Sequence, residues 1–406
     1  MDKNKENIPK IRFPGFEEPW EQCKLGELVT QVIREIDKPN EPYWKMSVRS
    51  HAKGTFRQFV DEPQKVAMDK LYVVYEDDLV VNITFAWEHA IAVASNEDTG
   101  MLVSHRFPMY RADGKSDIKF LKYLVSQEYF RRKMDLISPG GAGRNRVLSK
   151  SEFLKIEVVV PCKIEEQASI GLLFAKLDNF ITLHQRKLEH LQDKKKGLLQ
   201  KMFPKEGEKL PEIRFPGFTD PWEQRKFYEE VEFYSGLTYS PNDVSDNGTF
   251  VLRSSNVKNG EVVDADNVYV DTEVVNSSNV KEGDIIVVVR NGSRSLIGKH
   301  AQVKKNMDKT VIGAFMTGIR SNQPSFINAL MDTQQFSGEV EKNLGATINQ
   351  ITNGMFREMR FMFPDIEEQN QIGNFFNKLD DLITLHHRKL EHLQQQKKGL
   401  LQQMFI

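Results

Sequence analysis

The chain has 406 residues, of which 39% are hydrophobic and 28% charged, and its formal net charge is −1. This composition is typical of a globular chain long enough for two domains. The net charge excludes a protein that binds nucleic acid through an overall basic charge. No apolar run approaches the roughly 20 residues that span a bilayer, and residues 1–10 lack the apolar core of a secretory signal, so we expect a cytoplasmic protein.

The charge distribution and the cysteine content limit how this chain could bind DNA, metals or disulfide partners. Lys plus Arg against Asp plus Glu count 26 to 24 in residues 1–163 and 18 to 23 in residues 205–365. Any DNA contact must therefore come from local clusters of basic residues or be shared with partner subunits. Only Cys23 and Cys162 are present, without zinc-like spacing, so neither a disulfide framework nor a metal site is expected.

One pattern occurs twice, at an offset of 202 residues. Residues 11–20 (IRFPGFEEPW) return as residues 213–222 (IRFPGFTDPW), and residues 164–204 return as residues 366–406 with about 29 of 41 positions identical. The intervening residues have diverged almost completely, which predicts one duplicated scaffold with two different recognition surfaces. We predict a first lobe at residues 1–163, a helix at 164–204, a second lobe at 205–365 and a helix at 366–406.

The motif RFPGF followed by PWE opens each half. Pro14 and Gly15, repeated as Pro216 and Gly217, are turn formers between large apolar residues. We interpret the motif as a hook that fastens each lobe onto a helix. A contact with a partner protein is the alternative interpretation.

In the first lobe, two polar groups carry the side chains that read DNA in other proteins. Arg or Lys reads guanine, Asn or Gln reads adenine, and phosphates bind positive charge or exposed amides. A glycine-rich loop at residues 140–143 allows a close backbone approach and is the best predicted DNA site, with a solvated turn as the alternative. The candidate DNA-binding residues of this lobe are Arg49, His51, Lys53, Arg57, Arg144, Asn145 and Arg146.

The repeated segments at residues 164–204 and 366–406 carry a heptad seam, with apolar residues at spacings of three and four. In parallel pairing Lys195 would face Lys397 inside the seam, and like charges there are destabilising. We therefore predict antiparallel helices, with His184 opposite Leu390. The predicted packing residues are Ile170, Phe174, Leu177, Ile181, Leu188, Leu191 and Leu198 in the first helix, and Ile372, Phe376, Leu379, Ile383, Leu390, Leu393 and Leu400 in the second.

Further apolar residues lie beside this seam. Leu183, Leu199 and Phe203 in the first helix, repeated at Leu385, Leu401 and Phe405, widen the apolar stripe beyond what one partner helix covers. We predict that two copies of a partner dock there. An intramolecular hairpin that only joins the lobes is the alternative. About 38 helical residues would form a rod of roughly 55 Å, which we expect to separate the lobes by one to two turns of B-DNA.

The second lobe offers a different set of side chains. The loop at residues 345–350 matches the glycine-rich loop of the first lobe but has lost its charge. Residues 292–300 are a poor phosphate loop, because the glycine spacing is one residue too long and His300 replaces the Ser or Thr that would hold magnesium. The candidate DNA-binding residues are Arg253, Ser254, Asn256, Arg290, Asn291, Arg294, Thr347, Asn349 and Gln350.

Several repeated motifs together resemble the specificity subunit of bacterial type I restriction-modification systems. They are RFPGF with PWEQ, IEEQ at residues 164–167 and 366–369 after Pro161 and Pro364, and the KKGLLQ endings of both helices; the resemblance covers the whole chain. It implies an α/β fold in which two target recognition domains are joined by two long helices as an antiparallel coiled coil with an internal pseudo-twofold repeat. Each domain would read one half of a split, asymmetric DNA target.

The resemblance also implies partners and a division of labour. Two modification subunits, which bind S-adenosylmethionine and methylate adenine, would dock on the helices. Two restriction subunits, which use ATP and magnesium, would join them in defence against foreign DNA. No cofactor, catalytic residue or metal site is expected in this chain, which has no Asn-Pro-Pro or Asp-Pro-Pro motif of an amino-methyltransferase. The alternatives are a fused methyltransferase or nuclease, and a structural adaptor that joins partner subunits without binding DNA.

Overall fold

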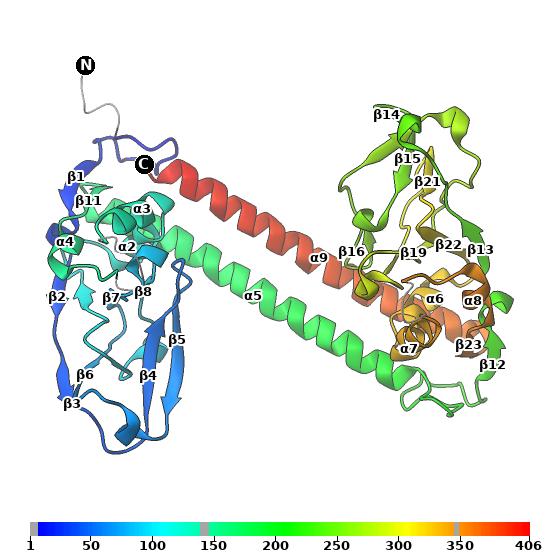
Figure 1. The fold of residues 1–406 in the computed structure, drawn as a ribbon, viewed down its shortest axis with the longest axis horizontal. Helices are drawn as coiled ribbons and strands as arrows, with labels where there is room; N and C mark the ends of the chain where they lie inside the picture. The colour runs from blue at the N-terminus through cyan, green and yellow to red at the C-terminus, as the bar shows by residue number, and fades with distance from the viewer. Residues whose placement is uncertain (1–6, 139–145, 345–348) are drawn as a thin grey trace. The chain divides into compact units, whose positions relative to one another are not determined.

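The structure, a computed structural model, describes residues 7–138, 146–344 and 349–406 (Figure 1). By their contacts these residues form a first unit, Met1–Leu183 with Glu391–Ile406, and a second unit, His184–Leu390. Each unit contains a lobe and part of both long helices, α5 (Ile164–Met202) and α9 (Ile366–Met404). The two helices begin where the repeated segments begin and have the same length of 39 residues.

The lobe of the first unit has a four-stranded sheet in the order β2-β10-β7-β8, a five-stranded sheet in the order β3-β6-β9-β4-β5, and the ribbon β1-β11. Its strands are β1 (Glu21–Lys24), β2 (Thr30–Val32), β3 (Glu35–Asp37), β4 (Tyr43–Val48), β5 (Thr55–Val60), β6 (Lys70–Val73), β7 (Leu79–Val81), β8 (Ile91–Val93), β9 (Leu102–Val103), β10 (Met109–Arg111) and β11 (Glu157–Val160). Its helices are α1 (Leu25–Leu28), α2 (Ile118–Val125), α3 (Glu128–Leu136) and α4 (Lys150–Leu154), with 3-10 turns η2 (Pro63–Lys65), η3 (Ala86–Glu88) and η4 (Asn96–Asp98).

The lobe of the second unit has four-stranded sheets in the orders β13-β22-β19-β20 and β14-β18-β15-β21, and the ribbons β12-β23 and β16-β17. Its strands are β12 (Glu223–Lys226), β13 (Glu232–Ser235), β14 (Val244–Ser245), β15 (Thr249–Leu252), β16 (Val257–Lys258), β17 (Glu261–Val262), β18 (Val268–Val270), β19 (Ile285–Val288), β20 (His300–Gln302), β21 (Thr310–Ile312), β22 (Met316–Arg320) and β23 (Arg360–Phe363). Its helices are α6 (Pro324–Met331), α7 (Gln334–Asn343) and α8 (Asn353–Glu358), with 3-10 turns η5 (Phe227–Glu229), η6 (Pro241–Asp243), η7 (Ser254–Asn256), η8 (Thr272–Val274) and η9 (Arg294–Leu296).

The two lobes share one plan although their sequences have diverged. The sheet β2-β10-β7-β8 has the same order and the same antiparallel pairing as β13-β22-β19-β20. The second sheets differ, because β4 forms a long hairpin with β5, whereas β15 pairs with β18 and β21. The predicted fold class, two mixed α/β lobes with two long helices, is confirmed.

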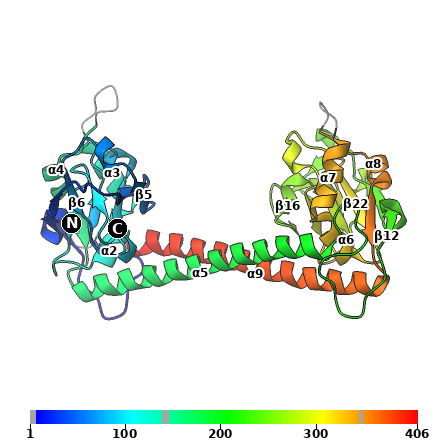
Figure 2. The ribbon, with the colours of Figure 1, turned by 90° about the horizontal axis from the view of Figure 1, so that it is seen from below.

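The strands β7 and β19, which lie inside the two matching sheets, are short apolar runs that are buried on both faces, as such runs usually are. In β19, Ile285 and Val287 face the core made with α6, α7 and the long helices, whereas Ile286 and Val288 face a separate core toward the second sheet. Figure 2 shows α6 and α7 against the sheet that contains β22. Each lobe is therefore a helix layer, a central sheet and a second sheet.

Within each unit the two long helices run in opposite directions. In the first unit, Ile170 and Phe174 near the start of α5 share a core with Met404 and Phe405 at the end of α9. In the second unit, Phe203 after the end of α5 packs on Phe376 near the start of α9, with ring centroids 6.3 Å apart. All predicted seam residues are buried or half-buried, and the seam ends pack against the lobes as well as against the other helix.

The register prediction for His184 was wrong. Instead of lying opposite Leu390, its Nδ1 lies 2.9 Å from Nδ1 of His386, the same position of the other repeat. The two histidines therefore face each other, and one imidazole nitrogen must donate while the other accepts.

Each seam lysine binds an aspartate of the opposite helix. Lys195 Nζ lies 2.5 Å from Asp380, and Lys397 Nζ lies 2.5 Å from Asp178, which is the repeat equivalent of Asp380. Lys195 also binds Asp332 at 2.6 Å. Burial alone would lower the pKa of Lys195, but the two aspartates raise it above its ordinary value. The two seam lysines thus form reciprocal ion pairs.

The predicted apolar stripe divides into two parts. Leu199, Phe203 and Phe405 are buried and Leu401 is half-buried, all within the lobe cores, so they are not free for a partner. This corrects the prediction for these positions. Leu183 is 62% exposed, and its repeat equivalent Leu385 is 60% exposed.

The repeated RFPGF motif is a hook in both halves. In the first unit, Arg12 Nε donates to Glu166 at the start of α5 (2.7 Å), and the Ile11 amide donates to the Gln403 carbonyl at the end of α9 (3.0 Å). Trp20 is buried beside them. The hook therefore fixes the start of one helix beside the end of the other.

The second unit repeats these bonds. Arg214 Nε donates to Glu368 (2.7 Å), and the Ile213 amide donates to the Lys201 carbonyl (2.8 Å). Trp222 is buried and its Nε1 donates to Glu368 at 3.1 Å. In both halves the interpretation of the motif as a docking hook agrees with the structure.

Two repeated glycines of α5 predict opposite effects of alanine. A Cβ at Gly171 would lie 2.6 Å from the Phe120 amide nitrogen, whereas a Cβ at Gly197 would meet nothing within 4 Å. We expect Gly171→Ala to lower the free energy of unfolding by about 1 to 3 kcal/mol through overpacking. Gly197→Ala should raise it by about 0.5 to 1 kcal/mol through helix propensity. Urea unfolding measures both, and a neutral Gly171→Ala would contradict the close helix-lobe contact.

Two histidines predict that stability falls in acid. Burial, with help from His184 and Lys187, lowers the pKa of His386 below its ordinary 6.5, and burial lowers that of His89. The unfolded chain therefore binds more protons below pH 6.5, so this part of the stability is complete above pH 6.5 and is lost as the pH falls below it. Urea midpoints between pH 7.5 and 5.5 should drop less in His386→Gln than in the exposed control His392→Gln. An equal drop would contradict the prediction.

Candidate nucleic-acid interface

In the first unit, one residue at the end of the central strand holds three segments together. The Ile83 amide donates to the carbonyl of Arg106 (3.0 Å), and the Ile83 carbonyl accepts from the amide of Leu148 (2.8 Å). These bonds join the loop after β7, the turn before β10 and the segment that begins at Arg146. A surface built from three distant parts of the chain results.

The turn between β4 and β5 joins the same surface. Ser50 Oγ donates to Glu88 in η3 (2.5 Å), and the His51 amide donates to the Glu88 carbonyl (2.8 Å). The guanidinium of Arg146 lies over the Trp87 ring of η3, 5.8 Å from its centroid. Predicted residues that are about 100 positions apart in sequence thus meet at η3.

The remaining predicted residues of the first lobe have different surroundings. Arg49, His51 and Lys53 are exposed in the turn, and the guanidinium of Arg49 lies over Phe56 at 5.6 Å. Arg146 also binds Asp135 at 3.2 Å. The glycine-rich loop, with Arg144 and Asn145, lies outside the described residues.

Arg57 is the predicted residue of this lobe whose side chain is bound by two acidic partners. Its guanidinium binds Glu97 at 2.6 Å and the fully buried Asp98 at 3.3 Å. Drawing Arg57 toward DNA would leave the Asp98 carboxylate with one charged partner fewer in a buried place, which is unfavourable. Its role in the structure is to hold η4 against β5.

The second unit has the same pair of backbone hydrogen bonds as Ile83 makes in the first unit. We call this pair of bonds the frame. The Val289 amide donates to the Phe315 carbonyl (3.0 Å), and the Val289 carbonyl accepts from the Ile351 amide (2.9 Å). Val289 is therefore the counterpart of Ile83, Phe315 that of Arg106, and Ile351 that of Leu148. This correspondence supports the alignment of the two predicted loops.

The predicted polar residues of the second lobe gather around this frame. Asn291 Nδ2 donates to Ser254 Oγ (3.2 Å), as the loop residue Glu88 binds Ser50 in the first unit. Asn349 Nδ2 donates to the carbonyl of Gly292 (3.1 Å). An isolated β-bridge joins Arg290 to Gln350, the Arg290 guanidinium lies over the Phe315 ring at 5.1 Å, and Arg294 is exposed in η9. Thr347 lies outside the described residues.

Asn256 in η7 and Arg253, which directly precedes η7, have structural partners. Asn256 is fully buried, its Oδ1 accepts from the Arg253 amide, and its Nδ2 donates to the Ala265 carbonyl at 2.6 Å. Its side chain holds its own loop together, and its contact with DNA stays a prediction. Arg253 forms an ion pair with Asp266 and keeps a position at the edge of the surface.

Three residues on these two surfaces were missed by sequence reasoning. Arg106 and Phe315 follow no recognisable motif, and they reach the surface only because β10 and β22 pair with the central strands. Trp87 was missed as well, since a single tryptophan in an apolar stretch normally indicates core. A strand-pairing prediction could have found the first two.

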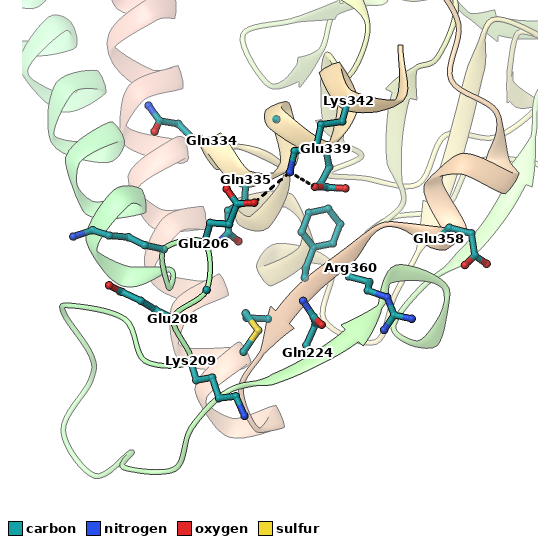
Figure 3. A pocket seen from close by; sticks show the side chains of 15 residues that line it. Glu206, Glu208, Lys209, Gln224, Gln334, Gln335, Glu339, Lys342, Glu358 and Arg360 are labelled. Atoms are coloured by element: carbon teal, nitrogen blue, oxygen red, sulfur yellow. Dashed lines mark hydrogen bonds and ion pairs between the residues drawn. The ribbon is translucent and has the colours of Figure 1, made fainter. Parts of the chain in front are cut away.

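A polar pocket elsewhere in the second unit offers no comparable site. It has a volume of about 520 Å³ and lies between the segment at residues 205–209, β12, α7 and β23 (Figure 3). Its Lys342 binds Glu339 at 2.9 Å and Glu206 at 3.4 Å. The pocket is lined mainly by charged side chains and glutamines, with Phe361 and Met362, and its lining includes no His, Cys, Ser or Thr.

No cluster of three or more His, Cys, Asp or Glu residues suited to a metal ion occurs in residues 7–138, 146–344 and 349–406. Within the same ranges no helix is long and apolar enough to cross a membrane.

A duplicated α/β scaffold with two polar surfaces, each combining arginines with exposed or half-exposed aromatic rings, defines a protein suited to reading DNA. Comparison with known proteins identifies the group. Residues 219–395 match the family model described as type I restriction modification DNA specificity domain. Residues 219–395 thus carry a type I restriction-modification DNA specificity domain, and the function that the comparisons support is DNA sequence recognition.

Individual relatives extend the similarity over the whole chain. The type I restriction enzyme MjaVIII specificity subunit of Methanocaldococcus jannaschii is 23% identical over 98% of this chain and 94% of its own length. The putative MjaX specificity subunit of the same organism is 22% identical over 98% and 95%. The crystal structure of a type I restriction-modification S subunit from M. genitalium shares the fold, with a TM-score of 0.66, 12% identity and coverage of 98% and 99%.

Proposed function

We propose that each unit reads one half of a bipartite, asymmetric DNA sequence. The observation that carries this proposal is the shared frame around Ile83 and Val289, which presents different side chains in the two units. A fixed backbone with exchanged side chains is what two readers of different half-sites require. The non-binding adaptor is not favoured, because the family is defined by DNA specificity.

We further propose that the exposed leucines of the long helices bind two modification subunits. Phe180 and Leu183 in α5 are 53% and 62% exposed, and their repeat equivalents Leu382 and Leu385 in α9 are 47% and 60% exposed. Apolar side chains exposed at repeated positions of one scaffold give two equivalent docking surfaces. Two restriction subunits would join through the modification subunits.

The chemistry of this complex would belong to the partners. S-adenosylmethionine would bind the modification subunits, and ATP and magnesium the restriction subunits. The chain itself would supply sequence recognition, and because its target is DNA we place it in the cytoplasm.

Two experiments test this function. Binding selection from random duplexes by the chain with its modification subunits should enrich two short specified sequences separated by unspecified bases. Native mass spectrometry should show two modification subunits for each chain, and Leu183→Asp with Leu385→Asp should remove both. Enrichment of no sequence would contradict DNA reading, whereas a different stoichiometry would contradict only the docking model.

A further inference from the structure

The turn before β10 and the turn before β22 place two unlike residues at one position of the shared frame. The backbone carbonyls of Arg106 and Phe315 accept from the amides of Ile83 and Val289, which lie just after the central strands β7 and β19. The inference below rests on the proposed function, because it assigns a role to this position in reading DNA.

The Phe315 ring is not part of a core. It is 55% exposed, whereas the next residue, Met316, is 2% exposed and fills the core below it. The ring lines an open pocket of about 710 Å³ together with Val244, Ala314 and the edge residues Arg253 and Ser254. An exposed aromatic ring among proposed DNA contacts therefore has an apolar side available to a ligand.

Arginine on the same surface fixes the orientation of that ring. The Arg290 guanidinium lies 5.1 Å from the centroid of the Phe315 ring, on one face. The ring edge and the pocket side remain for contact. If Arg290 contacts one base pair in the major groove of DNA, Phe315 would lie at a neighbouring base pair.

Arg106 offers the opposite chemistry at the equivalent position. It is exposed, and within the described part of the chain no hydrogen bond or ion pair to its guanidinium occurs. The next residue, Phe107, is buried, as Met316 is in the second unit. The backbone position is thus preserved and only the outward side chain has changed.

We propose that this position determines specificity in both units. Phe315 contacts the C5 methyl group of a thymine in the half-site of the second unit, and Arg106 binds the O6 and N7 acceptors of a guanine in the other. The thymine methyl is the apolar group that the major groove displays, and the guanidinium fork matches the two guanine acceptors. Packing the ring against the methyl removes apolar surface of both from water.

Removal of the thymine methyl tests Phe315. The probes are duplexes that carry the mapped target, with deoxyuridine in place of every thymine of one half-site or of the other. The wild-type complex should bind one substituted duplex about fourfold more weakly for each contacted methyl. Phe315→Ala should bind that duplex and its thymine parent equally well. Phe59→Ala, which removes an equally exposed ring (54%) from β5, should keep the wild-type discrimination.

An analogous probe tests Arg106. Replacement of guanine by 7-deazaguanine in the other half-site should weaken wild-type binding about five- to 100-fold, and Arg106→Ala should lose this difference. A half-site of the second unit without an A·T pair, or a guanine-free half-site of the first, would overturn the proposal.

The outcomes separate this inference from the proposed function. Bipartite binding that ignores deoxyuridine would overturn the Phe315 assignment alone, and if Phe315→Ala still weakened binding, the ring would act as a wedge between bases. Absence of any sequence-selective binding would overturn the proposed function itself.

Discussion

Arg214→Met is expected to lower the free energy of unfolding by about 3 to 5 kcal/mol, which is the largest effect on stability that the structure predicts. Glu368, its partner at the start of α9, is fully buried, and Arg214 is only 13% exposed. Without the guanidinium, the carboxylate keeps Trp222 Nε1 as a donor but no charged partner. A buried, uncompensated charge is the source of the large cost.

Matched variants separate this effect from a general loss of charge. Lys342→Met removes a lysine from an exposed ion pair with Glu339 and should change stability far less, because solvent screens such pairs. Adding Glu368→Gln to Arg214→Met should recover part of the loss, because the buried charge is then gone. Urea unfolding followed by circular dichroism measures all three. Equal stability of Arg214→Met and wild type would show that the hook does not hold the helix.

Arg146→Ala and Arg290→Ala are expected to weaken DNA binding at different half-sites. Each guanidinium lies over an exposed or half-exposed aromatic ring on the candidate interface. A contact with a base edge would cost about 1 to 3 kcal/mol at one half-site, and a contact with a phosphate would lower the salt slope by about 1. Fluorescence titration at several salt concentrations distinguishes the two kinds of contact.

Arg57→Ala is the control for this pair. It removes the same side chain from the first unit, but from an ion pair with Glu97 and Asp98. Its affinity and salt slope should equal those of the wild type, within the effect of its lower stability. If all three arginines weakened binding equally, the assigned surfaces would be wrong.

The sequence was most informative where a pattern was repeated. The 202-residue offset predicted both long helices and the hook, because the same contacts are made twice by the same residues. Asp178 and Asp380 show that the sequence also contained a further predictable contact. They recur at that offset with Lys195 and Lys397, so their reciprocal ion pairs follow from antiparallel pairing.

The candidate site was only partly predictable, for physical reasons. Residue type identified Arg290, Asn291 and Asn349, which meet in the structure, but it could not distinguish the buried, bonded Asn256 from an exposed asparagine. The position of Phe315 depends on strand pairing with Val289, which no local spacing encodes. The His184 register was missed because the seam ends pack on the lobes as well as on each other.

Methylome sequencing of cells that carry this chain with its modification subunits tests the two-surface reading of DNA most directly. We expect a motif of two different specified halves separated by unspecified bases, of which Arg146→Ala relaxes one half and Arg290→Ala only the other. A single continuous motif, or one variant that relaxes both halves, would contradict the assignment of one half-site to each unit.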